Sequence, residues 1–309
     1  MDINFKVFMT NPLISVIITC FNQEKQIIKT LQSVLSQTHI EWECIIINDG
    51  STDNSEGAIK TFIEDDSRFK YKYQANIGVS AARNAGFKLA SGNFVNFLDG
   101  DDTFLPNKLK EQVGVFQNNP EISVCVCNHQ FYSESNNKYT YFEFSKIETK
   151  PLEQFLYKWH NGIALPLHSP LYKRSIWNKD ELPFPEDYIY RCEDWVFNVL
   201  VALKDVNYYM LDKVLCNYHM AATNFTNNNK SLTTAAIKAA LYLKPKLPEQ
   251  YQEDFIDTTI DNNLSMYLES EKINILQQSA NWRMANTISK PFFKIITYKE
   301  LCWYVGCHH

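Results

Sequence analysis

The sequence predicts an α/β protein with a mostly parallel central sheet and a helical extension toward its C-terminal end. Three observations lead to this fold class. Short apolar runs alternate with segments of helical periodicity through the first 130 or so residues, acidic turns directly follow two of those runs, and the pattern beyond residue 226 is helical. We therefore expect an α/β domain over residues 1–225 and a helical region over residues 226–309.

The first half of the chain alternates strictly between the two patterns. Continuous apolar, β-branched runs are typical of strands buried on both faces of a parallel sheet, and apolar residues at spacings of three and four indicate amphipathic helices. Strands are expected at Leu13–Thr19, Trp42–Asn48, Phe69–Gln74, Phe94–Leu98 and Ile122–Cys127. Helices are expected at Glu24–Gln37, from Ser55 onward, at Val79–Ala90 and from Pro106 to Gln117.

The pattern is less regular in the second half. A polar-tipped hairpin is expected at Phe131–Phe142, and four prolines between residues 166 and 185 indicate an ordered loop region. Two short strands are expected within Tyr208–Tyr218. Further helices are expected at Leu152–Trp159, Cys192–Leu203, Ser231–Leu243, Glu249–Gln278 and Pro291–Tyr304.

Composition excludes several classes of function. The 309 residues carry a formal net charge of −5, which argues against nucleic acid as a partner because phosphate binding requires a basic face. No apolar run is long enough to span a bilayer, and Met1–Thr10 contains Asp2 and Lys6 where a signal peptide would have an apolar core. We expect a cytoplasmic protein.

The nine glycines form neither a dinucleotide fingerprint nor a P-loop. A nucleotide would therefore be bound through carboxylates and a metal rather than through a glycine-rich cradle. Two acidic turns, Asp49–Asp53 and Asp99–Asp102, follow predicted strands, and ligands of open α/β sheets bind beyond the carboxyl ends of strands.

The second acidic turn places Asp99, Asp101 and Asp102 within four residues. Like charges this close repel one another unless a cation relieves them, and oxygen-only ligands favour Mg²⁺ or Mn²⁺. Capping of the helix that begins near Pro106 explains a lone D-x-D equally well. The buried strand before it and the acidic turn at Asp49 favour the metal site.

Five blocks in this order resemble the inverting family-2 glycosyltransferases of the GT-A (Rossmann-like) fold, of the bacterial surface-glycan or lipid-linked-oligosaccharide type. The resemblance covers residues 13 to about 220, and it implies transfer of a sugar from a nucleotide diphosphate, most often UDP, to a hydroxyl group. The blocks are Ile14–Asn22, Cys44–Asp53, Asn76–Gly86, Asn96–Asp102 and Cys192–Phe197.

The resemblance also implies roles for individual residues. Thr19 and Phe21 would flank the nucleotide base, and Asp49 would accept a hydrogen bond from the uracil imide. Arg83 would face the nucleotide, and Asp101 would contact the ribose or the donor sugar.

The same resemblance assigns the metal and the base. Asp102 would bind Mg²⁺ or Mn²⁺ together with Asp99 and Asp101. Glu193 and Asp194 match the family's catalytic pair, with Asp194 as the general base that takes the acceptor proton. Because Asp194 starts a helix, the helix dipole is expected to keep it ionised. Without the resemblance, simple capping of that helix is the preferred interpretation.

Three further residues are candidate diphosphate or acceptor contacts. His219 stands where many family members have an arginine, so it either faces the diphosphate or is a satisfied polar residue. His168 lies in a segment expected between the acceptor site and the base. Trp195 either stacks on a sugar ring or belongs to the core.

We therefore predict an enzyme that moves a hexose, glucose or an N-acetylhexosamine, from a UDP-sugar to a hydroxyl of a glycan, with a polyprenyl-diphosphate-linked glycan as one candidate acceptor. A sugar nucleotidyltransferase is disfavoured because Thr19–Gln26 contains no glycine and one lysine. A non-catalytic glycan-binding relative is disfavoured because binding alone requires no base.

The chain end has a separate charge pattern. Residues 273–309 carry a net charge of +3 against −8 for the rest of the chain, and lysines alternate with aromatic residues over 289–305. Such a segment suits an anionic membrane surface, which would make the protein peripheral on the inner face of the cell membrane. Packing on its own domain or on a second subunit is the alternative.

Overall fold

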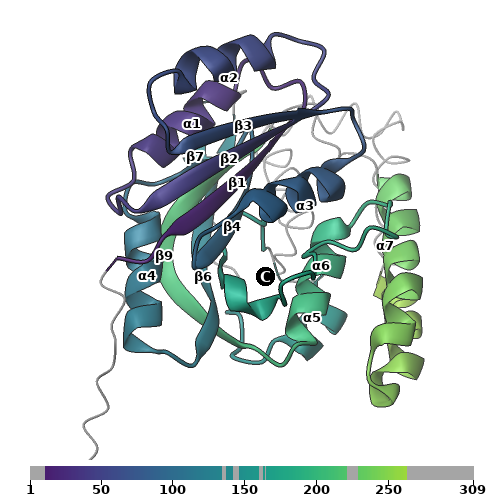
Figure 1. Ribbon diagram of the computed structural model, residues 1–309. Coiled ribbons are helices and arrows are strands. Elements are labelled where there is room, and N and C mark those ends of the chain that lie inside the picture. The colour runs from purple at the N-terminus through teal and green to yellow at the C-terminus, as the bar shows by residue number, and fades with distance from the viewer. Residues whose placement is uncertain are drawn as a thin grey trace, which may run out of the picture.

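A central sheet between two layers of helices makes up the protein, as the computed structural model shows (Figure 1). The structure describes residues 11–133, 137–141, 146–159, 163, 165–220 and 229–262. The expected helix at Pro291–Tyr304 and the basic segment 289–305 lie outside the described residues, and so does the expected domain boundary at 225.

Among the described residues the strands form one mixed sheet in the order β3-β2-β1-β4-β8-β6-β9-β5, with β7 added to β6. Neighbours from β3 to β4 are parallel, as are β6 and β9, whereas β8 runs antiparallel between β4 and β6. The strands are β1 (Ile14–Cys20), β2 (Trp42–Asp49), β3 (Phe69–Gln74), β4 (Phe94–Asp99), β5 (Thr103–Phe104), β6 (Ile122–Ser133), β7 (Lys138–Thr140), β8 (Leu171–Lys173) and β9 (Asn207–Met220).

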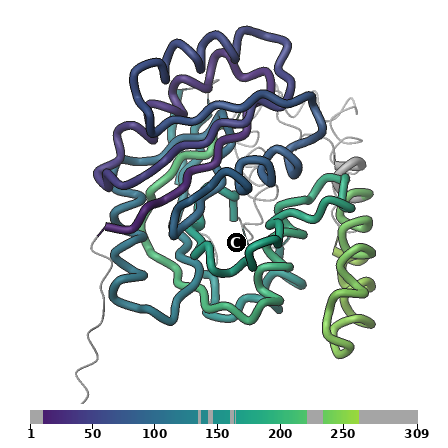
Figure 2. The backbone as a smooth tube through the Cα atoms, viewed as in Figure 1, coloured from purple at the N-terminus to yellow at the C-terminus, as the bar shows by residue number. Residues whose placement is uncertain are grey.

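Two hydrophobic clusters assign the helices to opposite faces of the sheet. One layer contains α1 (Ile27–Leu35), α2 (Ser55–Ile63) and α4 (Lys108–Asn118). The other contains α3 (Val79–Leu89), α5 (Leu152–Tyr157), α6 (Glu193–Ala202) and α7 (Asn229–Leu243), with short 3₁₀ turns at Arg174–Ile176 and Lys244–Lys246. Residues 249–262 are also helical. Figure 2 shows α7 at the outer edge of its layer, alongside the part of the chain that contains α6.

The first strand shows why the sheet is buried on both faces. Ile14, Val16 and Ile18 point into the cluster under α1 and α4, whereas Ile17 points into the cluster under α3. All seven residues of β1 are buried. A continuous apolar run therefore forms a central strand, and the predicted α/β fold with a mostly parallel sheet and C-terminal helices is confirmed.

Three local predictions are corrected. Residues 207–220 form one long strand with an irregular register against β6, where two short strands were expected. The Pro-rich region contains β8, which is only three residues long and therefore too short for periodicity to reveal. Helix α1 begins at Ile27 and not at Glu24, because residues 24–26 form a turn in which the N–H groups of Gln26 and Ile27 both donate to the Gln23 carbonyl.

The loops after β1 and β2 are joined by hydrogen bonds between their backbones and side chains. The Asn22 side-chain oxygen accepts the Thr52 N–H at 2.8 Å, and the Asn22 N–H donates to Ser51 Oγ at 3.0 Å. The Gln23 N–H donates to Ser55 Oγ at 2.9 Å. These bonds fix the loops that follow β1 and β2 relative to each other.

Helix α3 approaches the sheet closely because Gly86 has no side chain. A Cβ at this position would lie 2.3 Å from Cγ2 of Ile17, well inside van der Waals contact. We predict that Gly86→Ala lowers the free energy of unfolding by about 1–3 kcal/mol through overpacking, measured by denaturant unfolding.

The matched control is Gly114→Ala on α4, where a Cβ would meet nothing within 4 Å. Because alanine is the better helix former, this substitution should raise the free energy of unfolding by about 0.5–1 kcal/mol. Equal effects of the two substitutions would contradict the close approach of α3 to β1.

Candidate active site

The carboxyl ends of three parallel strands bring most of the predicted nucleotide and metal residues to one edge of the sheet. In the sheet register Thr19 of β1 lies beside Asp99 of β4, and Cys20 lies beside Asn48, one residue before Asp49. The Thr19 hydroxyl donates to Asp99 Oδ1 at 3.4 Å. Residues that are 80 positions apart in sequence are thus neighbours at this edge.

Asp49 fixes the turn that leads into α3. It is buried, and its Oδ1 accepts hydrogen bonds from Gln74 Nε2 at 2.8 Å and from the Ile77 N–H at 3.2 Å. Its Oδ2 accepts the Gly78 N–H at 3.0 Å, where the backbone is left-handed with φ of +98°. A carboxylate offers about four lone-pair positions, so one position on Oδ2 remains for a ligand.

Phe21 is exposed at the end of β1, with 45% of its surface accessible. A large aromatic side chain at a strand end, next to hydrogen-bonding loops, has the character of a platform for a planar ring. The structure therefore leaves Phe21 available for the predicted contact with a base.

Arg83 of α3 joins two acidic segments that are far apart in sequence. Its Nη2 lies 2.8 Å from Oδ1 of Asp99, and its Nη1 lies 3.1 Å from Oε1 of Glu193. The guanidinium is buried, with 4% of the side chain exposed. The two ion pairs therefore hold the end of β4 against the start of α6.

Both members of the Asp99–Arg83 pair are charged. Burial opposes ionisation of Asp99, but the nearby Arg83 guanidinium outweighs it and holds the pKa of the carboxyl below its ordinary value. Burial likewise disfavours the charged form of Arg83, yet the carboxylates of Asp99 and Glu193 raise its pKa. The cation thus reduces the repulsion between the two carboxylates.

Asp194 is only partly exposed in the first turn of α6, and its Oδ1 accepts the N–H of Trp195 at 2.8 Å. Burial, followed by the charge of Glu193, raises the pKa of Asp194 to about 7. These two effects oppose the helix dipole, which was expected to keep this carboxylate ionised. A carboxylate with a pKa near neutrality is well matched to general-base chemistry.

Asp102 behaves differently from its neighbours in the acidic turn. Its carboxylate is buried, with Oδ2 at 2.7 Å from His168 Nδ1 and Oδ1 accepting the His219 N–H at 2.8 Å. Burial raises the pKa of Asp102 well above its ordinary range and lowers the pKa of His168 to about 3. Both shifts disfavour the charged forms of the two side chains.

The fit of a divalent ion depends on the other two carboxylates. Within the described residues no group of three His, Cys, Asp or Glu side chains is arranged to hold an ion. Nucleotide sites, however, bind Mg²⁺ through one or two carboxylates and the substrate phosphates. The Asp99 carboxylate is 38% exposed and Asp101 is partly exposed, so these two fit such a site. Asp102, also expected as a ligand, has a hydrogen-bond partner on each carboxylate oxygen and a side chain that is 3% exposed.

The three candidate diphosphate or acceptor contacts lie in different environments. His219 is buried at the end of β9, its ring centroid is 5.1 Å from that of Tyr132, and its main chain binds Asp102. His168 is 1% exposed beneath the acidic turn, which leaves it no surface for an acceptor.

Trp195 is a core residue. It is fully buried and donates its indole N–H to the Phe155 carbonyl at 2.7 Å. The suggested sugar contact is therefore corrected in favour of the core alternative.

Sequence reasoning missed Asn84, which stands beside Arg83 on α3. Its Nδ2 donates to the Phe184 carbonyl at 2.7 Å, and its Oδ1 accepts the Phe184 N–H at 3.1 Å. These two bonds hold the loop before α6 against α3 and so help to place Asp194. The sequence shows Arg83 and Asn84 side by side in the block Asn76–Gly86. No pattern in it indicates that Asn84 binds Phe184, 100 residues away.

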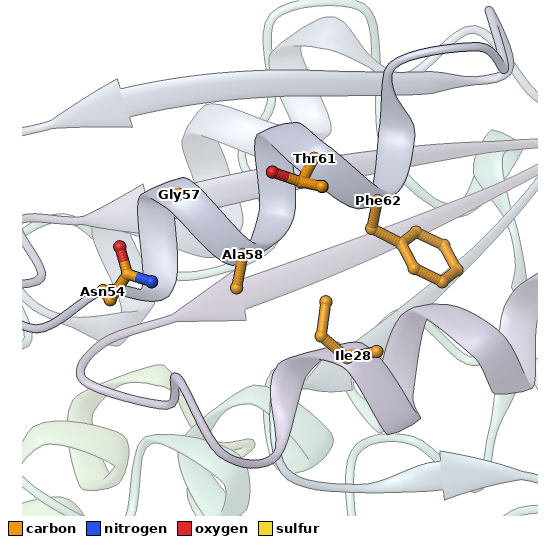
Figure 3. A pocket seen from close by; sticks show the side chains of 6 residues that line it. All are labelled: Ile28, Asn54, Gly57, Ala58, Thr61 and Phe62. Carbon is orange, nitrogen blue, oxygen red and sulfur yellow. The ribbon is translucent and has the colours of Figure 1, made fainter.

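A hollow of about 400 Å³ lies elsewhere, between α1 and α2 (Figure 3). No ionisable side chain is among its lining residues, and it is separate from the edge where Asp49, Asp99 and Asp194 gather. It is therefore not a candidate for the chemistry. The lining residues are Ile28, Asn54, Gly57, Ala58, Thr61 and Phe62.

Fold and site together define a sugar-transferring enzyme of the GT-A type. The chain belongs to glycosyl transferase family 2, whose model matches residues 15–178. It is 30% identical over 247 residues to the uncharacterized glycosyltransferase EpsJ of Bacillus subtilis, and the matched region covers 78% of this chain and 68% of that protein. It is 32% identical over 259 residues to an uncharacterized glycosyltransferase of Nostoc, with 79% and 75% covered.

Solved structures show the same fold at low sequence identity. Residues 1–349 of TarS from S. aureus, in complex with UDP-GlcNAc, superpose with a TM-score of 0.61 at 19% identity, over 82% of this chain and 72% of that one. The mannosyltransferase PcManGT from Pyrobaculum calidifontis, in complex with GDP-Man and Mn²⁺, gives a TM-score of 0.60 at 13% identity, over 96% and 86%. The protein is a glycosyltransferase.

The pKa of Asp194 leads to a pH prediction. A base with a pKa of about 7 is protonated below that pH, so kcat/KM should fall as the pH drops through 7. Because the charge of Glu193 contributes to the raised pKa, Glu193→Gln should move this acid limb to lower pH by about one unit. The measurement is the pH profile of sugar transfer.

The matched control is Glu186→Gln, since Glu186 lies in the loop before α6 with its side chain 70% exposed. This variant should keep the acid limb of the wild type. An acid limb that shifts upward in Glu193→Gln would contradict the electrostatic coupling of Glu193 to Asp194.

Proposed function

We propose that this glycosyltransferase is a metal-dependent, inverting enzyme that moves a hexose from a UDP-sugar to a hydroxyl group of a glycan, with Asp194 as the general base. One observation supports the proposal above all others. Arg83 contacts both Asp99 and Glu193, so the acidic turn at the end of β4 and the candidate base on α6 lie on the same side of the molecule. A donor held at the turn would therefore be near the base.

The donor nucleotide is proposed from the residues at the ends of β1 and β2. Thr19 and Phe21 would flank the base, while Asp49 would accept the imide N–H of uracil through its remaining lone pair. Cytosine has no N–H at that ring position, which is why a carboxylate selects uracil. The TarS neighbour was solved with UDP and with UDP-GlcNAc, which supports a uridine donor and glucose or an N-acetylhexosamine as the sugar.

Asp99 and Asp101 would hold Mg²⁺ or Mn²⁺ together with the diphosphate, and the bound ion would supply charge stabilisation for the leaving group. The PcManGT neighbour was solved with Mn²⁺ and GDP-Man, which supports a metal at this kind of site. Asp101 would also contact the ribose or the donor sugar. His219, at the end of β9 beside the acidic turn, would be the neighbouring group on the diphosphate side.

The chain's own residues perform the proton transfer. As the acceptor oxygen attacks the anomeric carbon, Asp194 removes the proton of the acceptor hydroxyl, and the bond to the diphosphate oxygen breaks. Arg83 holds Glu193 in place beside Asp194 through its ion pair with Oε1. A single displacement with the base on the face opposite the leaving group inverts the configuration at the anomeric carbon.

The acceptor is proposed to be a glycan, with a polyprenyl-diphosphate-linked glycan favoured by the basic aromatic segment 289–305. That segment would bring residues 226–309 to an anionic membrane surface, while residues 1–225 carry the chemistry. Within the described residues, none of the helices combines the length and the apolar character that crossing a membrane requires.

The first test measures release of UDP from a panel of UDP-sugars, with Mn²⁺ and with excess EDTA. We expect hydrolysis or transfer with UDP-glucose or UDP-N-acetylhexosamines, and loss of activity by about 100-fold or more in EDTA because the leaving group is no longer stabilised. GDP-mannose serves as the control donor. Activity that is unchanged by EDTA would rule out the metal, and a preference for GDP-mannose would rule out the role given to Asp49.

The second test is Asp194→Asn, which keeps the shape of the side chain and removes its basicity. We expect kcat to fall by about 100-fold or more, with UDP affinity by calorimetry within about threefold of the wild type, because the base does not contact the nucleotide. Asp180→Asn, at an exposed turn, is the control and should behave as the wild type. Wild-type turnover by Asp194→Asn would refute the assignment of the base.

A further inference from the structure

The acidic turn is fixed at each of its ends. The Gly100 N–H donates to the Thr19 carbonyl at 3.0 Å, and the Gly100 carbonyl accepts the Thr30 hydroxyl at 2.9 Å. Thr103 pairs with Asn217 of β9, whose side chain donates to Thr103 Oγ1 at 2.9 Å. Asp102 lies between these attachments, and its side chain is the part of the turn that is buried.

The partner of Asp102 belongs to a segment that is itself immobilised. His168 is followed by Ser169 and Pro170, and Asn96 Nδ2 of β4 donates to the carbonyls of His168 at 3.0 Å and Pro170 at 2.6 Å. The Ser169 carbonyl accepts Gln112 Nε2 of α4 at 2.9 Å. His168, Ser169, Asn96 and Gln112 are each at most 1% exposed.

Beneath this segment, Lys108 donates to Gln112 Oε1 at 2.8 Å although its side chain is fully buried. The Ser169 hydroxyl also donates to the Cys127 carbonyl of β6. Buried polar groups favour one arrangement of the chain when they are hydrogen-bonded. Each residue of this network makes at least one such bond, although Asn96 Oδ1 and His168 Nε2 have no hydrogen-bond partner among the described residues. The imidazole of His168 is thus held in one position, and its Nδ1 lies 2.7 Å from Oδ2 of Asp102.

We infer that Asp102 is a positioning residue and not a metal ligand: its carboxylate clamps the acidic turn to His168 and to the His219 main chain, so that Asp99 and Asp101 are presented to the nucleotide-sugar diphosphate. The inference rests on the proposed function, because it concerns the same site. In this arrangement both carboxylate oxygens of Asp102 take part in hydrogen bonds. A neutral side chain of the same shape, such as that of asparagine, would preserve them.

The decisive variant is Asp102→Asn. Its amide oxygen can accept the His219 N–H, and its NH₂ can donate to His168 Nδ1, so both clamp bonds survive while a metal-binding carboxylate is lost. We expect its UDP affinity in Mn²⁺, measured by calorimetry, to stay within about threefold of the wild type. Asp101→Asn is the comparison, and it should lose about tenfold or more in Mn²⁺ and less in EDTA, where only its contact with the ribose is removed.

Asp102→Ala and His168→Leu each remove the clamp. Each should lower UDP affinity in Mn²⁺ by about tenfold and lower the melting temperature. The double variant should be no worse than either single variant, because both changes break the same contact. Additive losses of melting temperature and affinity in the double variant would overturn the clamp.

If Asp102→Asn loses its response to Mn²⁺ as completely as Asp101→Asn at an unchanged melting temperature, Asp102 is a ligand and the inference is wrong. This comparison remains decisive even where the alanine variant fails to fold. A wild-type chain that binds neither UDP nor GDP in Mn²⁺ would reject the proposed function instead. The thermal coupling between Asp102 and His168 would then still support or overturn the clamp.

Discussion

The pairing of one buried cation with two carboxylates from distant segments is the constraint on which the site depends. Arg83 is nearly inaccessible to solvent, so its buried charge requires the compensation that Asp99 and Glu193 provide, and the guanidinium in turn offsets the repulsion between these two carboxylates. Because Arg83 lies on α3, between the end of β4 and the start of α6, satisfying its charge also fixes three elements relative to one another. Removal of Arg83 would leave Asp99 and Glu193 without the cation that pairs with both.

The electrostatic consequences differ for each acidic residue of the site, although all are carboxylates in the same region. Asp99 is held ionised by Arg83, whereas Asp194 has no direct cation partner among the residues that the structure describes, and its pKa is raised by burial and by Glu193. Asp102 is buried against a histidine and favours the neutral state. The local environment thus gives three different carboxyl groups: an ionised Asp99, an Asp194 that titrates near neutral pH and an Asp102 whose charged form is disfavoured.

Most of the fold could be predicted because its signals are local. The apolar runs of β1, β2 and β4 and the helical spacing between them are patterns of residues close together in sequence. The structure places these three strands within one or two residues of the prediction. The three-residue strand β8 and the single long strand β9 could not be predicted, because their pairing partners are remote in sequence. Likewise, no pattern tells whether Trp195 faces a ligand or the core, since both placements fit an amphipathic helix.

The sequence by itself determined the alternation of strands and helices, the two acidic turns at strand ends and the family to which the chain belongs, because residue types at short spacings encode these features. Only the tertiary structure decided which carboxylates are accessible. Asp101 and Asp102 are adjacent and chemically identical, and they differ only in what the fold places around them. Burial, hydrogen-bond partners and the nearest charge are properties of segments brought together from a hundred residues apart, and they set what each carboxylate can do.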